Sequence, residues 1–208
     1  MSPKTLIPST LTLFLIFLLT ACSPPEENNI PEQVFTTYET ATYKIQLTEN
    51  YIGADPKTPG LNVVINWMTA NGFDAQGFSS FMQAKASEIL YVGINTELSV
   101  SNLLSYFTLT GGAKPEGFSV DEFEQNYNKT VGTENFLSRE QKELGENPIE
   151  ILHYKFSQDD TIYLSSFYFL ETATQIWKFE FVAPKTDHDD KIAEFEQIVA
   201  QFQPRPGQ

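Results

Sequence analysis

The sequence predicts an α+β domain in which helices pack against a central antiparallel sheet. Two observations lead to this prediction. Three strand-like runs, at residues 149–156, 161–170 and 174–182, follow one another with hairpin-length connections, which is typical of an antiparallel meander. Stretches with apolar residues at helical spacing lie before and after these runs, so helices are available to cover the sheet.

Two strands are expected in the N-terminal part of the domain. Residues 43–47 alternate apolar and polar side chains, with Tyr43, Ile45 and Leu47 on one face. A turn-rich stretch follows. Residues 61–68 (LNVVINWM) are then predicted as a second strand, whose shared face carries Leu61, Val63, Ile65 and Trp67.

A helix and two short strands are expected next. The helix is predicted over residues 75–89, with a face formed by Phe78, Phe81, Met82, Lys85 and Ile89, of which Lys85 is the polar exception. The two strands are predicted at residues 90–95 and 102–110. The pair Gly111–Gly112 is interpreted as a plain loop, because no Lys-Ser or Lys-Thr of a phosphate-binding loop follows it.

Two further helices have clear start signals. Residues 119–122 (SVDE) form a capping box, in which the Ser119 hydroxyl accepts from the third helical amide and Glu122 reaches back. The last helix opens at residues 186–189, and Pro204 follows its end. The apolar stripes of the two helices are Val120, Phe123, Tyr127 and Val131 in the first and Ile192, Phe195, Val199 and Phe202 in the last.

Aromatic side chains are expected to form much of the core. Trp67 and Trp177 stand at core spacing within their runs. Residues 163–169 place aromatic side chains on both faces of one strand, at Tyr163, Phe167, Tyr168 and Phe169. Either helices cover both faces of this strand, or one face is an exposed aromatic patch for a partner, and the sequence leaves both possibilities open.

Composition excludes several classes of protein. The chain of 208 residues is 41% hydrophobic and contains 17 Phe, 9 Tyr and 2 Trp, which excludes a disordered acidic tail. Its formal net charge of -14 argues against nucleic acid as a partner, because phosphate binding needs clustered Lys and Arg. The single cysteine excludes a disulfide framework and any multi-cysteine metal site.

That cysteine stands where a lipid anchor would be attached. Residues 11–19 (LTLFLIFLL) are long enough for the core of a signal peptide and too short to span a bilayer. The following Leu19-Thr20-Ala21-Cys22 resembles the bacterial lipobox. That resemblance implies cleavage before Cys22, a diacylglycerol on its sulfur and an acyl chain on its amine, while the alternative is an ordinary signal peptide with a chance cysteine.

These features divide the chain into four parts. They are a signal peptide (1–21), a Pro-rich polar tether (22–33), one domain (34–204) and a short tail (205–208). Without the signal peptide, 12 basic residues remain against 27 acidic ones, a side-chain balance of -15. Anionic lipid repels such a domain, so the expected membrane partner is reached through the anchor. In the Gram-negative sorting rule, an Asp directly after the lipid-modified cysteine retains the protein at the inner membrane. Residue 23 is Ser instead, which weakly favours the outer membrane in a cell that has one.

The order of elements resembles that of the PsbP-like family. The resemblance covers about residues 34–204 and is strongest from residue 119 onward, in the segments SVDEFEQNY, ENPIEILHYKF, WKFEFVAP and FEQIVAQFQP. It implies an α/β/α sandwich with a central antiparallel sheet. It also implies non-enzymatic roles in binding and in the assembly of membrane complexes, sometimes with metal ions nearby.

Few residues suggest chemistry. The cluster at residues 186–190 offers Asp187, His188 and Asp190 as ligands for a divalent cation, but it equally fits the acidic first turn of a helix, which we favour. His153 lies within a strand and has no nucleophile or carboxylate arranged around it by motif. No catalytic residue and no cofactor, other than the lipid on Cys22, is expected.

The sequence therefore predicts a lipid-anchored protein of the bacterial cell envelope. We expect it to act as a non-enzymatic binding or complex-assembly module with an unknown protein partner and no nucleic acid. Two alternatives remain. One is an envelope hydrolase that uses a pair of carboxylates, and the other is a surface protein that binds divalent cations through its excess negative charge.

Overall fold

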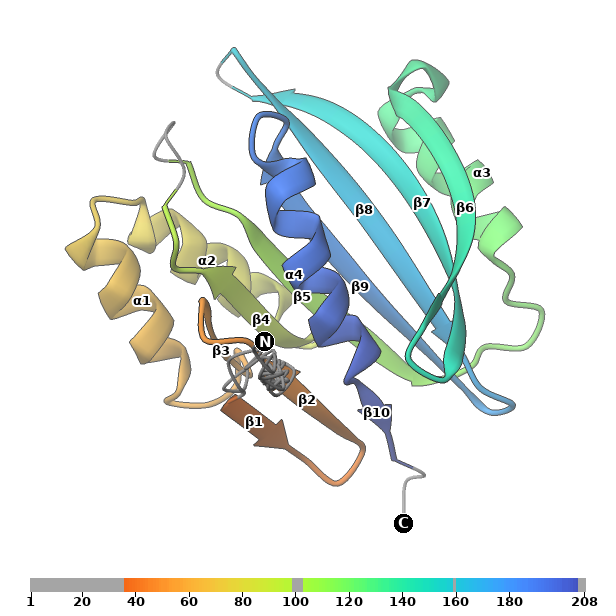
Figure 1. Ribbon diagram of the computed structural model, residues 1–208, viewed down its shortest axis with the longest axis horizontal. Coiled ribbons are helices and arrows are strands. Elements are labelled where there is room, and N and C mark those ends of the chain that lie inside the picture. The colour runs from red at the N-terminus through yellow and green to blue at the C-terminus, as the bar shows by residue number, and fades with distance from the viewer. Residues whose placement is uncertain (1–35, 99–102, 159, 206–208) are drawn as a thin grey trace, which may run out of the picture. The chain divides into compact units, whose positions relative to one another are not determined.

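The computed structural model describes residues 36–98, 103–158 and 160–205 (Figure 1). Cys22, the signal peptide and the tether predicted from the sequence lie outside these residues. Within them, the helices are α1 (Leu61–Ala70), α2 (Ala75–Lys85), α3 (Val120–Val131) and α4 (His188–Ala200), with a short 3-10 turn η1 (Thr133–Asn135). None of these described helices is long and apolar enough to cross a membrane.

The strands form two antiparallel sheets. In spatial order the large sheet consists of β3 (Tyr51–Ala54), β4 (Ile89–Asn95), β5 (Tyr106–Ala113), β9 (Gln175–Pro184), β8 (Thr161–Glu171), β7 (Asn147–Gln158) and β6 (Phe136–Leu144). The small sheet consists of β1 (Thr36–Glu39), β2 (Tyr43–Leu47) and β10 (Gln203–Pro204).

Helices cover both faces of the large sheet. In Figure 1, α4 crosses in front of the sheet, whereas α2 and α3 lie behind it. The main core lies on the α4 side, where β2, β9 and α4 meet and where Phe195 of α4 contacts Phe181 at a ring-centroid distance of 4.8 Å. On the opposite side, α1 and α2 form one apolar cluster with β4, and α3 forms a second with β7 and β8. This is the predicted α/β/α sandwich with a central antiparallel sheet.

The predicted meander is confirmed. Strand β7 pairs with β6 and β8, and β9 joins β8 to β5. Phe167 and Phe169 of β8 pack toward α3, while Tyr168 packs toward α4, so these aromatic side chains belong to the core on both faces. They do not form an exposed patch, because two helical layers cover them.

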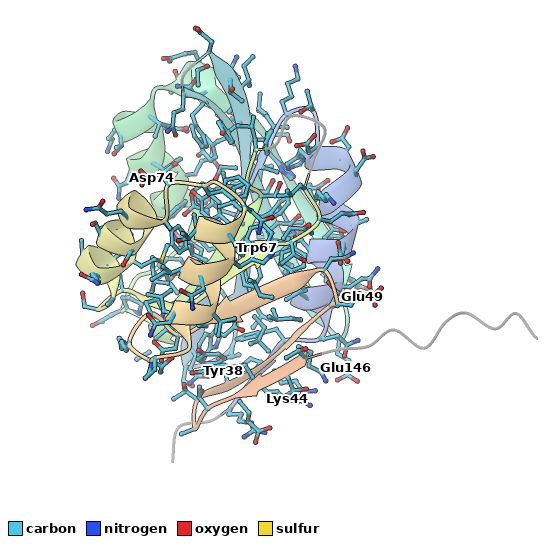
Figure 2. All side chains as sticks on the ribbon, turned by 90° about the vertical axis from the view of Figure 1, so that its left-hand side faces the viewer. Tyr38, Lys44, Glu49, Trp67, Asp74 and Glu146 are labelled. Atoms are coloured by element: carbon cyan, nitrogen blue, oxygen red, sulfur yellow. The ribbon has the colours of Figure 1, made fainter. Side chains whose placement is uncertain are left out.

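Several local predictions are also confirmed. The side chains of Tyr43, Ile45 and Leu47 are all buried, as their alternation indicated. The Ser119 hydroxyl caps α3 by accepting a hydrogen bond from the amide of Glu122 at 3.1 Å. Trp177 is fully buried. Trp67 is partly buried on α1, where its ring stacks on that of Phe73. Figure 2 shows Trp67 on the same side of the molecule as the hairpin that carries Tyr38.

The prediction of a strand at residues 61–68 is wrong, because these residues form α1. The buried side chains are Leu61, Val64 and Met68, which follow one another at helical spacing against the sheet. Val63, expected on the buried face of a strand, is 60% exposed. In this segment tertiary packing overrides the alternating pattern, since only the helical stripe reaches an apolar surface.

Two boundaries also differ from the prediction. Helix α2 ends at Lys85, so Ile89 belongs to β4, and Phe81, expected on the buried face, is 50% exposed. Strand β5 begins at Tyr106 rather than at residue 102, and it continues through Gly111–Gly112, which pair with β9 instead of ending the strand. The ring of Trp177 lies where a Cβ atom at Gly111 would stand, which explains the glycine.

Candidate functional site

An uncovered strip of the sheet lies between α2 and α3. The apolar clusters on this face belong to α1 and α2 at one end of the sheet and to α3 at the other. The two central strands, β5 and β9, carry Thr108 and Thr110 and, opposite them, Glu180 and Lys178. We call this strip, with its walls from α2 and α3, the α2–α3 groove.

Strand alternation places two charged side chains on the floor of this groove. Trp177, Phe179 and Phe181 of β9 point into the main core on the α4 side. Because successive side chains point to opposite faces, Lys178 and Glu180 point to the groove side, about 7 Å apart along the strand. Both side chains are half-buried rather than solvated.

The ammonium of Lys178 lies among aromatic rings. Its Nζ atom is 5.2 Å from the ring centroids of both Phe123 and Phe167. Among the described residues, no carboxylate lies within 4.0 Å of this atom. Burial lowers the pKa of Lys178, and the nearby charge of Glu180 opposes this shift.

The carboxylate of Glu180 has one neutral partner. The Ser165 hydroxyl donates a hydrogen bond to its Oε1 atom at 3.2 Å. Burial raises the pKa of Glu180, while the charge of Lys178 and the bond from Ser165 oppose the shift. Neither charge on the floor is therefore matched by an ion pair, which makes this groove a candidate ligand site.

Three adjoining cavities follow the groove. The first, of about 200 Å³, is lined by Lys178, Ile176 and three phenylalanines, Phe118 before α3, Phe123 on α3 and Phe169 on β8. The second, of about 180 Å³, is bounded by Phe81, Lys85 and Glu88 and has both charged floor residues. The third, of about 260 Å³, reaches from Glu180 to Tyr106, Tyr127, Tyr154 and Phe156. Shared lining residues join them into one depression.

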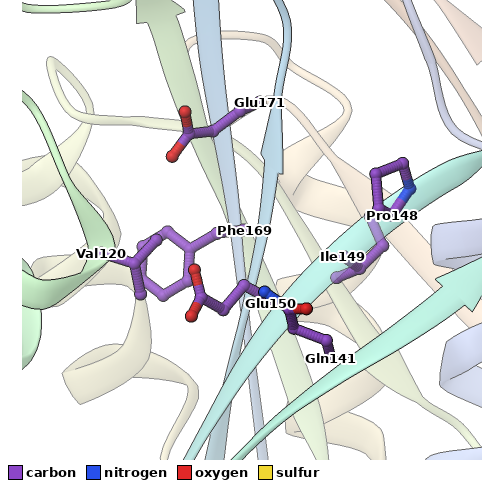
Figure 3. Close-up of a pocket in the computed structure, with 7 residues that line it drawn as sticks. All are labelled: Val120, Gln141, Pro148, Ile149, Glu150, Phe169 and Glu171. Carbon is purple, nitrogen blue, oxygen red and sulfur yellow. The ribbon is translucent and has the colours of Figure 1, made fainter.

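A further cavity, of about 200 Å³, lies beside the start of α3 (Figure 3). Figure 3 shows two carboxylates, those of Glu150 and Glu171, on the side of the cavity where Val120 lies. Glu150 forms an ion pair with Arg139, and Glu171 forms one with Lys114 at 2.5 Å. A carboxylate hydrolase needs one of its two carboxyl groups to act as an acid and the other as a base or nucleophile, and these two are held by cations instead.

The two histidines meet on the opposite face of the sheet. The Ser166 hydroxyl lies 2.8 Å from Nδ1 of His153 and 3.1 Å from Nε2 of His188. Glu140 lies 3.3 Å from the other ring nitrogen of His153. This Glu–His–Ser set has the composition of a catalytic triad, but Ser166 is 0% exposed, so its hydroxyl does not face a substrate site.

The residues proposed as metal ligands do not converge. His188 is directed to Ser166 and, through Nδ1, to Asp189 at 3.2 Å. Asp187 occupies the N-cap position of α4 without a side-chain capping hydrogen bond and is buried, whereas Asp190 is exposed. Within residues 36–98, 103–158 and 160–205, no group of three or more His, Cys, Asp or Glu side chains is placed to hold a metal ion.

Sequence reasoning missed Lys178 and Glu180. Both appear in the pattern W-K-F-E-F, which reads as a strand with one solvated face. A usable signal was present, because helices were expected to cover both faces of the sheet, and a strand inside such a sheet is expected to carry few charged residues. Charged residues on such a strand indicate either a buried ion pair or a site.

Comparison with known proteins supports the fold. No protein-family model matches the chain, and no curated protein matches it. The solution structure of the cyanobacterial PsbP (CyanoP) from Synechocystis sp. PCC 6803 is 10% identical, and the match covers 84% of this chain and 95% of that chain with a TM-score of 0.50. At this identity the likeness is one of fold, and it confirms the predicted PsbP-like architecture.

Two other solved structures are similar. One is LpqN of Mycobacterium tuberculosis, described as involved in cell envelope biogenesis, with 12% identity, coverage of 56% of this chain and 72% of that chain, and a TM-score of 0.44. The other is a protein of Bacteroides thetaiotaomicron, with 12% identity, coverage of 79% and 45%, and a TM-score of 0.46. This chain spans under half the length of the Bacteroides protein.

Proposed function

We propose that this protein is a non-enzymatic binding module, anchored to a membrane of the bacterial envelope through Cys22, and that its ligand site is the α2–α3 groove. The observation that carries the proposal is the floor of that groove. Lys178 and Glu180 are half-buried there, lack ion-pair partners among the described residues and border three adjoining cavities. A bound ligand would supply the missing partners.

Two groups of potentially catalytic side chains have environments that do not favour catalysis. The buried Ser166 is held between two imidazoles, and the carboxylates beside α3 are ion-paired. Groove residues, by contrast, are suited to recognition, because aromatic walls and a few polar groups fix the orientation of a small molecule. These features support binding as the primary activity.

The anchor follows from the sequence. Each buried methylene contributes about 0.8 kcal/mol, and stable anchoring takes more than one acyl chain, which the lipobox resemblance provides. The Pro-rich stretch at residues 23–33 would span roughly 30 Å if extended at about 3.1 Å per residue.

The anchor is tested by labelling cells with radioactive palmitate and separating membranes from soluble protein. Wild-type protein should be labelled and remain with the membranes, and Cys22→Ala should lose the label and the cleavage. Ser23→Ala, which alters the neighbouring residue, serves as the control and should behave as wild type. Unchanged processing and fractionation of Cys22→Ala would overturn the anchor.

The groove is tested separately, by NMR on the soluble domain from residue 34 with a library of neutral, cationic, anionic and zwitterionic fragments. Binding in the groove should shift the signals of Lys178, Glu180 and Tyr127 together. Thr108→Phe, which places a ring on the floor, should abolish these shifts. If no class of fragment affects the groove, the proposed binding function is wrong.

A further inference from the structure

The floor of the α2–α3 groove presents two unmatched charges of opposite sign. Lys178 and Glu180 lie two residues apart on the same face of β9, about 7 Å from each other. Among the described residues, neither has an ion-pair partner within 4.0 Å, and they do not form one together. Two charges held apart in this way fit a ligand that carries both signs.

The Glu180 end of the groove has the composition of an ammonium-binding pocket. Four aromatic side chains line the cavity of about 260 Å³ that this carboxylate borders, Tyr106, Tyr127, Tyr154 and Phe156, and the lining also contains Val131, Val182 and the exposed Lys155. The rings of Tyr127 and Tyr154 stand nearly perpendicular, at 78°, with their centroids 4.7 Å apart. Aromatic rings on several sides together with one carboxylate favour an organic cation.

Tyr154, which lines this cavity, also carries a buried polar atom. The hydroxyl oxygen of Tyr154 is buried, and it has no hydrogen-bond partner among the described residues. A buried hydroxyl without a partner destabilises the folded protein; among the described residues the Tyr51 hydroxyl, Asn128 Oδ1 and Trp177 Nε1 are likewise buried without a partner.

The Lys178 end is suited to an anion. Its ammonium borders the cavity of about 200 Å³, whose other lining residues are mostly apolar, and the backbone of β5 passes beside it at Thr110. The two phenyl rings below Nζ stabilise the cation but leave its hydrogen-bond donors unused. A carboxylate or phosphate oxygen would use these donors.

We propose that the α2–α3 groove binds a small organic zwitterion, with its ammonium group in the aromatic cavity beside Glu180 and its anionic group at Lys178. This inference rests on the proposed binding function and adds the chemical class of the ligand. Charge complementarity sets the direction in which the ligand lies along β9. Burial without a partner of opposite sign is unfavourable for each of the two charges on the floor. A zwitterion would supply an opposite charge to both of them at once.

The test is isothermal titration calorimetry of the soluble domain with a set of defined probes. The probes are glycine betaine and its longer-chain homologues, choline as the cation alone, and a simple carboxylate as the anion alone. Betaines whose charge separation matches the groove should bind more tightly than choline, and the carboxylate alone should bind most weakly. The affinity should pass through a maximum as the chain lengthens.

Substitutions at Lys178 and Glu180 test which charged group of the ligand lies at each end of the groove. Lys178→Met should lower the affinity for the tightest-binding betaine by about tenfold, to the affinity measured for choline. The affinity for choline itself should not change. Glu180→Gln should weaken both compounds by about tenfold. Lys129→Met and Glu143→Gln, which remove the same charges from exposed positions, are the matched controls and should bind as wild type does. Circular dichroism and melting curves establish that each variant is folded.

The outcomes separate this inference from the proposed function. If choline binds as tightly as every betaine, the placement of the ligand's anionic group at Lys178 is wrong. The same holds if Lys178→Met lowers the affinity for choline as much as the affinity for the betaine. If only neutral or purely anionic fragments bind in the groove, the zwitterion is overturned while the binding function stands. If nothing binds there, both proposals fail.

Discussion

The Ser166 hydroxyl lies 3.1 Å from Nε2 of His188, in the buried layer between β8 and α4. Nδ1 of His153 lies 2.8 Å from the same oxygen, so both histidines of the chain meet at one serine. A hydroxyl carries one proton and can donate to only one imidazole, which means that the other must donate to it. The hydrogen-bonding roles of the two ring nitrogens are therefore linked through Ser166.

The pH dependence of stability should reflect His188. Burial, followed by the nearby His153, lowers the pKa of His188 below its ordinary value of 6.5, although the hydrogen bond and charge of Asp189 and the charge of Glu196 oppose this. The unfolded chain then binds a proton more readily than the folded one. The free energy of unfolding should be fully maintained above pH 6.5 and fall as the pH decreases below it.

Urea denaturation over a pH series measures this effect. The variant His188→Gln should show a smaller decrease in the free energy of unfolding at acid pH than wild type. Asp190→Asn, an exposed neighbour on the same helix, provides the control. An identical pH dependence in His188→Gln and wild type would mean that His188 is not the group responsible.

Removing the central hydroxyl should destabilise the protein. Ser166→Ala takes away the shared partner of two ring nitrogens in a buried layer, and we expect a loss of about 1–3 kcal/mol in the free energy of unfolding at neutral pH. Ser157→Ala removes a hydroxyl from an exposed position of β7 and should change it by less than about 0.5 kcal/mol. Similar effects of the two substitutions would contradict the structural role of Ser166.

The two charges on the groove floor should reduce stability. Replacing unpaired, half-buried charges by apolar side chains of similar size is often stabilising. The double variant Lys178→Met with Glu180→Leu should therefore gain about 1–3 kcal/mol in the free energy of unfolding without ligand, measured by urea denaturation. A loss of stability would instead indicate that the two residues form a structural pair.

The glycine in β5 should not tolerate a side chain. At Gly111 an added Cβ would overlap the ring of Trp177 and approach the carbonyl oxygen of Ile176, both part of a tightly packed strand pair. We expect Gly111→Val to lower the free energy of unfolding by about 1–3 kcal/mol. In the control Gly60→Ala the added Cβ meets no atom closer than 3.2 Å, and tryptophan fluorescence during denaturation compares the two.

One guanidinium holds α3 against the sheet. Arg139 of β6 forms ion pairs with Asp121 at 2.5 Å and Glu124 at 3.1 Å, both on α3, and with Glu150 on β7. Val120 is the only fully buried residue of α3, so these ion pairs contribute to holding the helix in place. We therefore expect Arg139→Met to accelerate amide hydrogen exchange in α3, by an amount that corresponds to a decrease of about 1 kcal/mol in the free energy of local opening. Lys129→Met on the same helix is the control, and equal exchange in both variants would contradict the prediction.

The strands of the meander could be predicted because their patterns are local. Apolar and polar residues alternate in β2 and β9, and hairpin-length connections separate β7, β8 and β9. The Ser119 cap of α3 is likewise local, since the hydroxyl and the amide that it accepts from lie three residues apart. Such signals need no knowledge of the partner strand or helix.

Predictions failed where a local pattern admits two structures. Residues 61–68 are apolar at alternate positions, yet they are also apolar at Leu61, Val64 and Met68, and only the sheet beneath them selects the helix. Gly111–Gly112 reads as a chain break until the ring of Trp177, far away in the sequence, occupies the space of the missing side chain. In both cases the deciding contact is non-local.

By itself, the sequence predicted the antiparallel α+β architecture and a lipid attachment at Cys22, because strand alternation, helix caps and a segment that resembles a lipobox are features of consecutive residues. Only the tertiary structure decided where a ligand site could form. The groove exists because α2 and α3 pack at opposite ends of one sheet face and leave β5 and β9 uncovered between them. Lys178 and Glu180 become candidate ligand-binding residues for that reason, since the same alternation on a solvated strand would carry no function.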